Sequence, residues 1–277
     1  MSQVDLMMLF LLLMPLVAFY LVFKKNWVDE ELKKAATWGL VSGVFCITLT
    51  RIVYYPVEWF LGGDLRSFIT APREWWITLL ASVCIIGLIE EAIKASGGIM
   101  VAHLARFNKR PTIVFMAFSG CALSFSLLEN IQYYAIFGSH VVLPRMVISS
   151  TAHLYFSCMC AAIAANAINR PRSDSTVALR ILLAIIAAAV FHGLFDFVVF
   201  KLNLQMLSGV IIAFVSLFIL GIHEAWISVL KIDNQPREGL MICSGCGAFS
   251  IGRARFCNFC GSRIVLSRRD FTIKLAD

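Results

Sequence analysis

Seven apolar stretches, each long enough to cross a lipid bilayer, dominate this sequence. A transmembrane helix needs about 20 residues at a rise of 1.5 Å per residue. Only 15% of the residues are charged, which is too few to cover the surface of a water-soluble globule. The sequence therefore predicts an all-α integral membrane protein, a polytopic bundle of about seven transmembrane helices. The stretches run approximately over residues 4–23, 35–55, 75–102, 111–137, 144–168, 177–200 and 204–230.

The basic residues between the stretches predict how the bundle is oriented. They are concentrated after the first, third, fifth and last stretches and are scarce in the opposite loops. Because basic loops stay on the cytoplasmic side, we expect the N-terminus outside and the C-terminal tail in the cytoplasm, in the membrane of a bacterium. The first stretch has no basic residues before it and no small-residue cleavage site, so we expect it to be retained. The same distribution makes nucleic acid an unlikely partner in spite of a formal net charge of +7.

The chain divides near its C-terminus. The apolar periodicity stops at Leu230, which predicts a transmembrane domain over 1–230 and a polar linker over 231–241. A small module follows over 242–263, and a basic tail over 264–277 completes the chain.

The small module contains two CxxC pairs separated by ten residues. Four thiolates at such spacing form the closed tetrahedral site of structural zinc, and disulfides are rare in the cytoplasm. A module of this size cannot bury a core, so the metal would supply its folding energy. We therefore predict a cytoplasmic zinc ribbon, a structural rather than a catalytic site, that could bind a partner protein. Its ligands would be Cys243, Cys246, Cys257 and Cys260.

Three ionisable side chains lie in the middle of the third stretch: Glu90, Glu91 and Lys94. A charged side chain at the centre of a bilayer costs about 2.5–3.5 kcal/mol, so these groups should face the bundle interior. Glu90 and Lys94 are four residues apart on one helical face, which predicts an ion pair between them. Glu91 points about 100° away, which leaves it available as a proton acceptor.

The fourth and fifth stretches add further polar residues. Glu129 shares a helical face with Phe125 and Tyr133, and Asn130 lies beside the acid. The fifth stretch contributes a single histidine, His153. Each of these residues taken alone is more simply explained as a satisfied residue of the bundle core.

The sixth stretch carries a histidine and an acid four residues apart, and the depth of all these groups agrees. Asp196 could hold one ring nitrogen of His192 and leave the other free. If alternate helices run antiparallel, Glu90 lies at the middle of its stretch, and Glu129, His153 and His192 are displaced outward by about 4–8 Å. Asp196 lies farther outward, as expected of a partner of His192. Unrelated polar residues would not share one level, so we predict a single buried site.

In order and spacing these residues resemble the PrsW family of intramembrane proteases, over roughly residues 75–200. The matching elements are Glu90-Glu91-x-x-Lys94, Phe125-x-x-x-Glu129-Asn130-x-x-Tyr133, His153 and His192-x-x-x-Asp196. A weaker similarity extends to the CAAX-processing and bacteriocin-processing proteases, which have asparagine where this chain has Asp196. The resemblance implies a peptidase that hydrolyses membrane-anchored proteins, and related proteases include one that cuts an anti-sigma factor. It does not cover the cysteine-rich tail.

The resemblance implies a set of catalytic residues and a set of supporting residues, and two mechanisms remain open. In the first, Glu90 or Glu91 takes a proton from water, while His153 and His192 orient the water or stabilise an oxyanion. In the second, two histidines and a carboxylate hold a catalytic zinc ion. The sequence has no HExxH pair, which favours the metal-free glutamate mechanism. The expected catalytic residues are Glu90, Glu91, Glu129, His153, His192 and Asp196, with Lys94, Asn130 and Tyr133 in supporting roles.

Two other classes of function fit a bundle with buried polar residues. An ion- or proton-coupled transporter uses such groups as a relay, but the sequence lacks the inverted repeats of many transporters. A membrane scaffold would act through the zinc ribbon and the arginines near it. The outward displacement of the polar residues, under the protease interpretation, predicts cleavage near the extracytoplasmic side.

Overall fold

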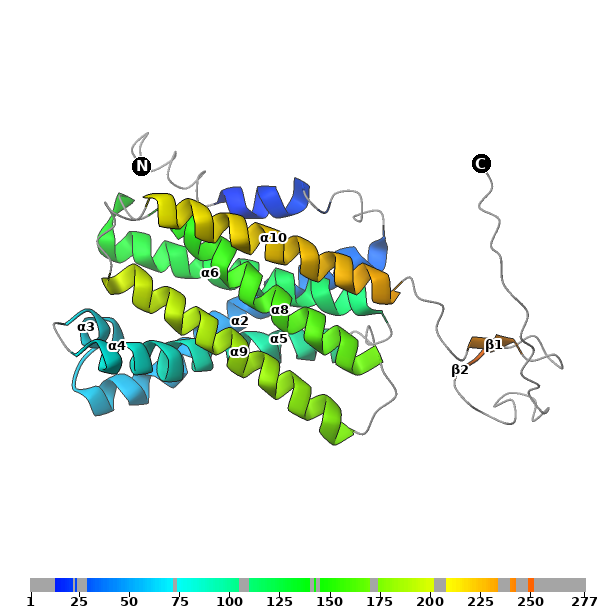
Figure 1. Cartoon of the computed structure of the whole chain (residues 1–277), viewed down its shortest axis with the longest axis horizontal. Coiled ribbons are helices and arrows are strands. Elements are labelled where there is room, and N and C mark those ends of the chain that lie inside the picture. The colour runs from blue at the N-terminus through cyan, green and yellow to red at the C-terminus, as the bar shows by residue number, and fades with distance from the viewer. Residues whose placement is uncertain are drawn as a thin grey trace. The chain divides into compact units, whose positions relative to one another are not determined.

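The computed structural model confirms a membrane-type helical bundle (Figure 1). It divides into two compact units, Met1–Asp233 and Asn234–Asp277. Six helices among the described residues are long and apolar enough to span a membrane, and they correspond to the last six predicted stretches. The first predicted span, 4–23, lies largely outside the described residues, although 13–21 is helical, so the count of seven stays a prediction. The structure describes residues 13–21, 23, 29–71, 74–104, 110–139, 142, 145–169, 174–201, 208–233, 240–242 and 249–251.

The helices of the first unit follow one another with short connections. Two of the spans contain a π-helix. In one of them a short α-helix is followed by a π-helix and then by a longer α-helix, and in the other a π-helix comes first and a longer α-helix follows. In chain order the elements are α2 (Glu30–Leu61), α3 (Leu65–Thr70), α4 (Trp75–Ala81), the π-helix η2 (Ser82–Gly87), α5 (Leu88–Leu104), α6 (Pro111–Phe137), the π-helix η4 (Arg145–Ser149), α8 (Ser150–Asn169), α9 (Asp174–Lys201) and α10 (Ser208–Asp233).

Helix α6 is the central helix of the bundle and is buried along most of its length. It packs against α2 through small residues, which let two backbones approach closely inside a membrane. A Cβ atom added at Gly39 or Gly43 of α2 would meet the carbonyl groups of Ala117 or Cys121 of α6. The hydroxyl of Ser124 donates a hydrogen bond of 2.6 Å to a backbone carbonyl of α2. This tight pair supports the helices that carry the polar residues.

The two π-helices lie directly before polar residues of interest. The π-helix η2 runs into α5 just ahead of Glu90, and η4 runs into α8 just ahead of His153. Helix α9 crosses η2 in close contact, since a Cβ atom at Gly193 would meet the backbone of Val83 and one at Gly87 would meet the carbonyl of Ala189. These contacts bring the middle of α9 against the start of α5.

A charged cluster ties together the ends of α2, α6 and α10. Asp29 caps α2 by accepting backbone N–H groups of Glu31 and Leu32 at 3.0 and 3.3 Å. Arg110 lies 2.8 Å from Asp29 and 3.6 Å from Asp233 at the end of α10. Burial opposes ionisation of Asp29, but the hydrogen bond from Arg110 and the backbone hydrogen bonds outweigh it, so the pKa of Asp29 is lowered.

The second unit contains a small antiparallel hairpin. Strand β1 (Leu240–Ile242) pairs with β2 (Phe249–Ile251), and Met241 lies opposite Ser250. In the sequence, the first predicted cysteine pair falls between these strands. The four predicted zinc ligands, Cys243, Cys246, Cys257 and Cys260, all lie outside the described residues, so the zinc ribbon stays a prediction.

Candidate active site

All the polar residues singled out in the sequence meet in one buried cluster inside the bundle. They come from four helices, and most of their side chains are almost completely excluded from the surface. Helix α5 contributes Glu90, Glu91 and Lys94; α6 contributes Glu129, Asn130 and Tyr133; α8 contributes His153; and α9 contributes His192 and Asp196.

The carboxylate of Glu90 is held on one side only. The hydroxyl of Tyr54, a buried residue of α2, donates a hydrogen bond of 3.0 Å to Oε1 of Glu90. The other oxygen, Oε2, is buried and has no hydrogen-bond partner among the described residues. The ring atom Nε2 of His192 lies 3.9 Å from it. Sequence reasoning missed Tyr54, because a tyrosine in an apolar helix of a membrane protein has no distinguishing signal.

The predicted ion pair between Glu90 and Lys94 is wrong. Nζ of Lys94 lies instead 2.5 Å from Oε1 of Glu91, three residues away, and both side chains are buried. The same oxygen lies 2.7 Å from Nδ1 of His192. Oε1 of Glu91 therefore contacts both a cation and an imidazole.

His192 has two carboxylate partners, the predicted Asp196 at one ring nitrogen and Glu91, which the sequence did not suggest, at the other. Nδ1 of His192 lies 2.7 Å from Oε1 of Glu91, so a neutral ring with its proton on Nδ1 would have the lone pair of Nε2 on the side of Glu90 and Asp196. Oδ2 of Asp196 lies 3.5 Å from that Nε2 atom, which is its one ion-pair contact among the described residues. Asp196 thus lies beside Nε2, the ring nitrogen that Glu91 does not contact.

The proton of His153 can be placed from its neighbours. Nζ of Lys94 lies 2.9 Å from Nδ1 of His153, and because an ammonium group can only donate, Nδ1 must accept. The proton of the neutral imidazole is then on Nε2, which donates to Oε2 of Glu129 at 2.8 Å. His153 and His192 are each oriented by a carboxylate through one ring nitrogen, the arrangement usual for metal-binding histidines.

An arginine that the sequence motifs did not include completes the cluster. Nη2 of Arg145, the first residue of η4, lies 2.8 Å from the same Oε2 atom of Glu129. Nε of Arg145 donates to Oδ1 of Asn130 at 3.0 Å, and Nδ2 of Asn130 donates to Ser150. Both ends of the Asn130 amide are therefore used within the protein. Sequence reasoning missed Arg145 because it lies at the end of an apolar stretch, where arginines are ordinary.

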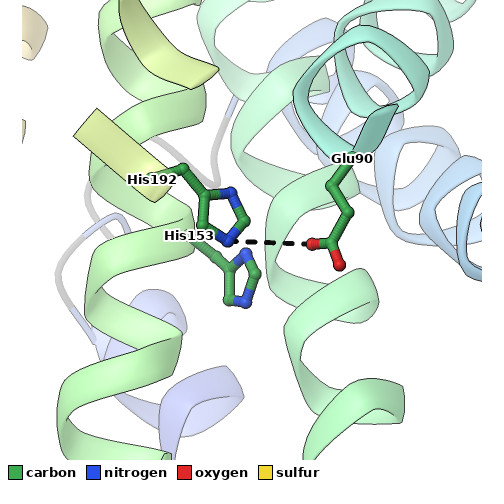
Figure 2. A group of neighbouring side chains, drawn as sticks. All are labelled: Glu90, His153 and His192. Carbon is green, nitrogen blue, oxygen red and sulfur yellow. Dashed lines mark ion pairs between the residues drawn. The ribbon is translucent and has the colours of Figure 1, made fainter. Parts of the chain in front are cut away.

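Three of these side chains, from three different helices, could hold a metal ion (Figure 2). Glu90, His153 and His192 each offer one ligand atom, and the three atoms lie within 4.8 Å of one another. The rings of the two histidines meet edge to face at 5.0 Å, and the ring of His192 stacks on Phe156 at 5.3 Å. Packing on both sides thus limits the movement of the two imidazoles.

The comparison with protein families agrees with this geometry. A model described as "PrsW family intramembrane metalloprotease" matches residues 31–221, more than half of the chain. The chain belongs to this family. As a PrsW family member it is an intramembrane protease, a hydrolase that acts on peptide bonds. No curated protein and no solved structure was found to match it.

The PrsW match extends further than the sequence motifs suggested. It begins in α2 and so includes Tyr54, and it ends within α10, before the cysteine-rich tail. The weaker similarity to the CAAX-processing and bacteriocin-processing proteases stays a prediction from the motifs.

Proposed function

We propose that Glu90, His153 and His192 hold a divalent metal ion at which this PrsW family protease hydrolyses peptide bonds of membrane-anchored proteins. The observation that carries the proposal is the convergence of these three buried side chains within 4.8 Å from α5, α8 and α9. Two histidines and one carboxylate with an open position are a common ligand set of hydrolytic zinc. The sequence alone favoured a metal-free mechanism, and the family description together with this convergence favours the metal.

The free atoms of the cluster fit a metal ion. Oε2 of Glu90 is buried without a hydrogen bond, which is costly for a carboxylate oxygen unless something else binds there. With its proton on Nδ1 facing Glu91, neutral His192 would offer the lone pair of Nε2 to the metal ion. Nδ1 of His153 faces the ammonium of Lys94, so Lys94 would withdraw from this atom and keep Glu91 as its partner.

Asp196 is the residue that we assign to proton transfer. When bound, a divalent cation would supply Lewis acidity to the scissile carbonyl group and lower the pKa of a water molecule. Glu91 and Glu129 are committed to orienting histidines, and Glu90 is committed as a ligand. Of these four acids, Asp196 alone has no hydrogen bond to the part of the chain that the structure describes, and it lies beside Nε2 of His192. It would take a proton from the attacking water and deliver it to the amine that leaves.

The position of the cluster along the spans suggests where the substrate is cut. Glu90 lies at the middle of its span, whereas Glu129, His153 and His192 lie nearer the Phe137, Arg145 and Val199 ends of theirs. These ends belong to the side that the basic loops predict to be extracytoplasmic. The proposal therefore places cleavage in the outer half of the membrane. A reporter fused to the C-terminus and found outside the cell would reverse this orientation.

The test uses the full-length protein in lipid nanodiscs with a library of transmembrane peptides. Metal ions per chain are counted by mass spectrometry, and cleavage is followed for Glu90→Gln, His192→Ala and Asp196→Asn. His223→Ala is the matched control, because His223 is an exposed histidine of another span. The metal count of a Cys243→Ser variant, compared with that of wild type, shows which of the counted ions belongs to the predicted zinc ribbon.

The outcomes distinguish the mechanisms. The proposal expects Glu90→Gln and His192→Ala to lose one metal and their activity, and Asp196→Asn to lose activity while it keeps the metal. His223→Ala should keep both. Loss of activity in Glu90→Gln with the metal content unchanged would favour the metal-free glutamate mechanism. Unchanged cleavage in all three variants would refute the site itself.

A further inference from the structure

We infer that Arg145 is a positioning residue of this protease: it fixes the carboxylate of Glu129, which holds the ring of His153 by Nε2, and so keeps Nδ1 directed into the cluster as a ligand atom. The inference rests on the proposed metal site, but its central observation concerns only hydrogen bonds among residues of the chain. Arg145 belongs to none of the sequence motifs.

A single oxygen atom connects the arginine to the histidine. Oε2 of Glu129 lies 2.8 Å from Nη2 of Arg145 and 2.8 Å from Nε2 of His153. An arginine can only donate hydrogen bonds, so the shared oxygen is an acceptor, and His153 must present Nε2–H to it. Lys94 already keeps the proton off Nδ1 of His153, so what Arg145 adds is the position of Glu129. Without Arg145, the carboxylate of Glu129 would be free to turn, and the ring of His153 would lose its fixed orientation.

Arg145 is itself locked in place on three sides. Nε donates to Oδ1 of Asn130 at 3.0 Å, and Nη2 donates to Oγ of Ser149 at 3.2 Å. The guanidinium lies over the ring of Tyr133, 3.3 Å from the ring centroid. Asn130 and Tyr133, the supporting residues predicted from the sequence, therefore act on the site through Arg145.

These contacts require the shape of the guanidinium as well as its charge. A flat group with several fixed donors can donate hydrogen bonds to Asn130 and Glu129 at the same time and still stack on the ring of Tyr133. The ammonium of lysine, in contrast, is a point charge on a flexible chain. If Arg145 served only to neutralise the charge of Glu129 inside the membrane, an Arg145→Lys variant would keep the zinc affinity of wild type. The conservative substitution therefore separates a positioning role from a role of charge alone.

The first measurement needs neither substrate nor metal. Full-length protein labelled with ¹⁵N-histidine is reconstituted in lipid and freed of metal at the membrane site with a chelator, and the nitrogen signals of its histidines are recorded. Loss of one histidine signal in His153→Gln assigns the resonances. Wild type should show one sharp Nε2–H signal for His153. Both Arg145→Gln and Arg145→Lys should show that signal broadened or split, because the ring is no longer held in one position, while Nδ1, which still faces Lys94, stays unprotonated.

The second measurement is the affinity of the membrane site for zinc, determined by competition with a chelator of known affinity. Loss of a partner that orients a metal ligand typically lowers metal affinity about 10- to 100-fold, which is the effect expected for Arg145→Gln. Arg51→Gln is the matched control, because Arg51 also bonds a side chain of α6, Gln132, but at an exposed position away from Glu129. The double variant Arg145→Gln/Glu129→Gln should bind zinc no more weakly than Glu129→Gln, since Arg145 acts through Glu129.

Two results would overturn the inference. One is an Arg145→Gln variant with the His153 nitrogen signal and the zinc affinity of Arg51→Gln. The other is an Arg145→Lys variant that matches wild type in both measurements, and this result decides the question even if Arg145→Gln does not fold. If wild type binds no metal at the membrane site, the proposed function fails, while the comparison of the His153 nitrogen signals still decides the role of Arg145.

Discussion

The hydrogen bond from Tyr54 to Glu90 leads to the sharpest test of the cluster geometry. Tyr54→Phe removes one hydroxyl group from a buried position and leaves Oε1 of Glu90 without its donor. A hydrogen bond to a charged group is worth about 1.5–3 kcal/mol, and about 1.4 kcal/mol corresponds to a tenfold change in rate. If that energy holds Glu90 in the orientation that exposes Oε2 to the histidines, cleavage should slow about 10- to 150-fold.

The adjacent tyrosine provides a matched control for this prediction. Tyr55 lies on the same helix with 72% of its surface exposed, so Tyr55→Phe makes the same chemical change on the outer face. Both variants are reconstituted in nanodiscs, and the initial rate of cleavage of one transmembrane peptide is compared at saturating metal. The reasoning is refuted if Tyr54→Phe and Tyr55→Phe cleave at the same rate as wild type, because Tyr54 would then have no part in placing Glu90.

Three further predictions concern the stability and packing of the bundle. Lys94→Met breaks a buried ion pair and should lower the free energy of unfolding by about 3–5 kcal/mol. Lys33→Met breaks an exposed pair of the same spacing and should lower it by about 1 kcal/mol or less. Equal thermal midpoints of the two variants in detergent would contradict this prediction. Gly193→Ala puts a Cβ atom against the backbone of η2 and should lower cleavage and cost about 1–3 kcal/mol, while Gly63→Ala, which meets nothing within 4 Å, should behave as wild type. Because the pKa of Asp29 is lowered, its contribution to the free energy of unfolding is complete above the ordinary carboxyl range and is lost as the pH falls through the lowered value. Thermal scans from about pH 6 to about pH 3 should therefore show a loss of stability that is smaller in Asp29→Asn. Identical profiles for wild type and Asp29→Asn would exclude a contribution of Asp29.

The fold was largely predictable because the bilayer restricts what an apolar sequence can do. Inside hydrocarbon, a backbone must satisfy its own hydrogen bonds, so a long apolar stretch with few charges has few alternatives to a helix. The last six predicted stretches accordingly match six described helices. The arrangement of these helices was not predictable in the same way. The central position of α6 depends on close packing by residues such as Gly39 and Gly43, which look unremarkable in a membrane sequence.

The membership of the polar cluster was predictable because of the same restriction. Charged side chains are expensive in a membrane, so each one that lies deep within a stretch must find partners inside the bundle. Glu90, Glu91, Glu129 and Asp196 therefore had to meet other polar groups, and the histidines at the same depth were the nearest candidates. Residues whose side chains cost little to place in a membrane helix or at its end, such as Tyr54, gave no comparable signal in the sequence.

The pairing within the cluster was not predictable, because distances along one helix do not decide between competing partners on other helices. Spacing alone favoured Lys94 with Glu90, but Glu91 receives both Lys94 and His192, at 2.5 and 2.7 Å. The close contact of Gly193 with η2 brings α9 against the start of α5, and so places His192 beside Glu91. Glu90 is left with a single neutral donor from α2 and one unbonded oxygen. The close approach of α9 and η2 at Gly193 and Gly87 thus explains why Glu91 is the glutamate with two partners and Glu90 is the one with an unbonded oxygen.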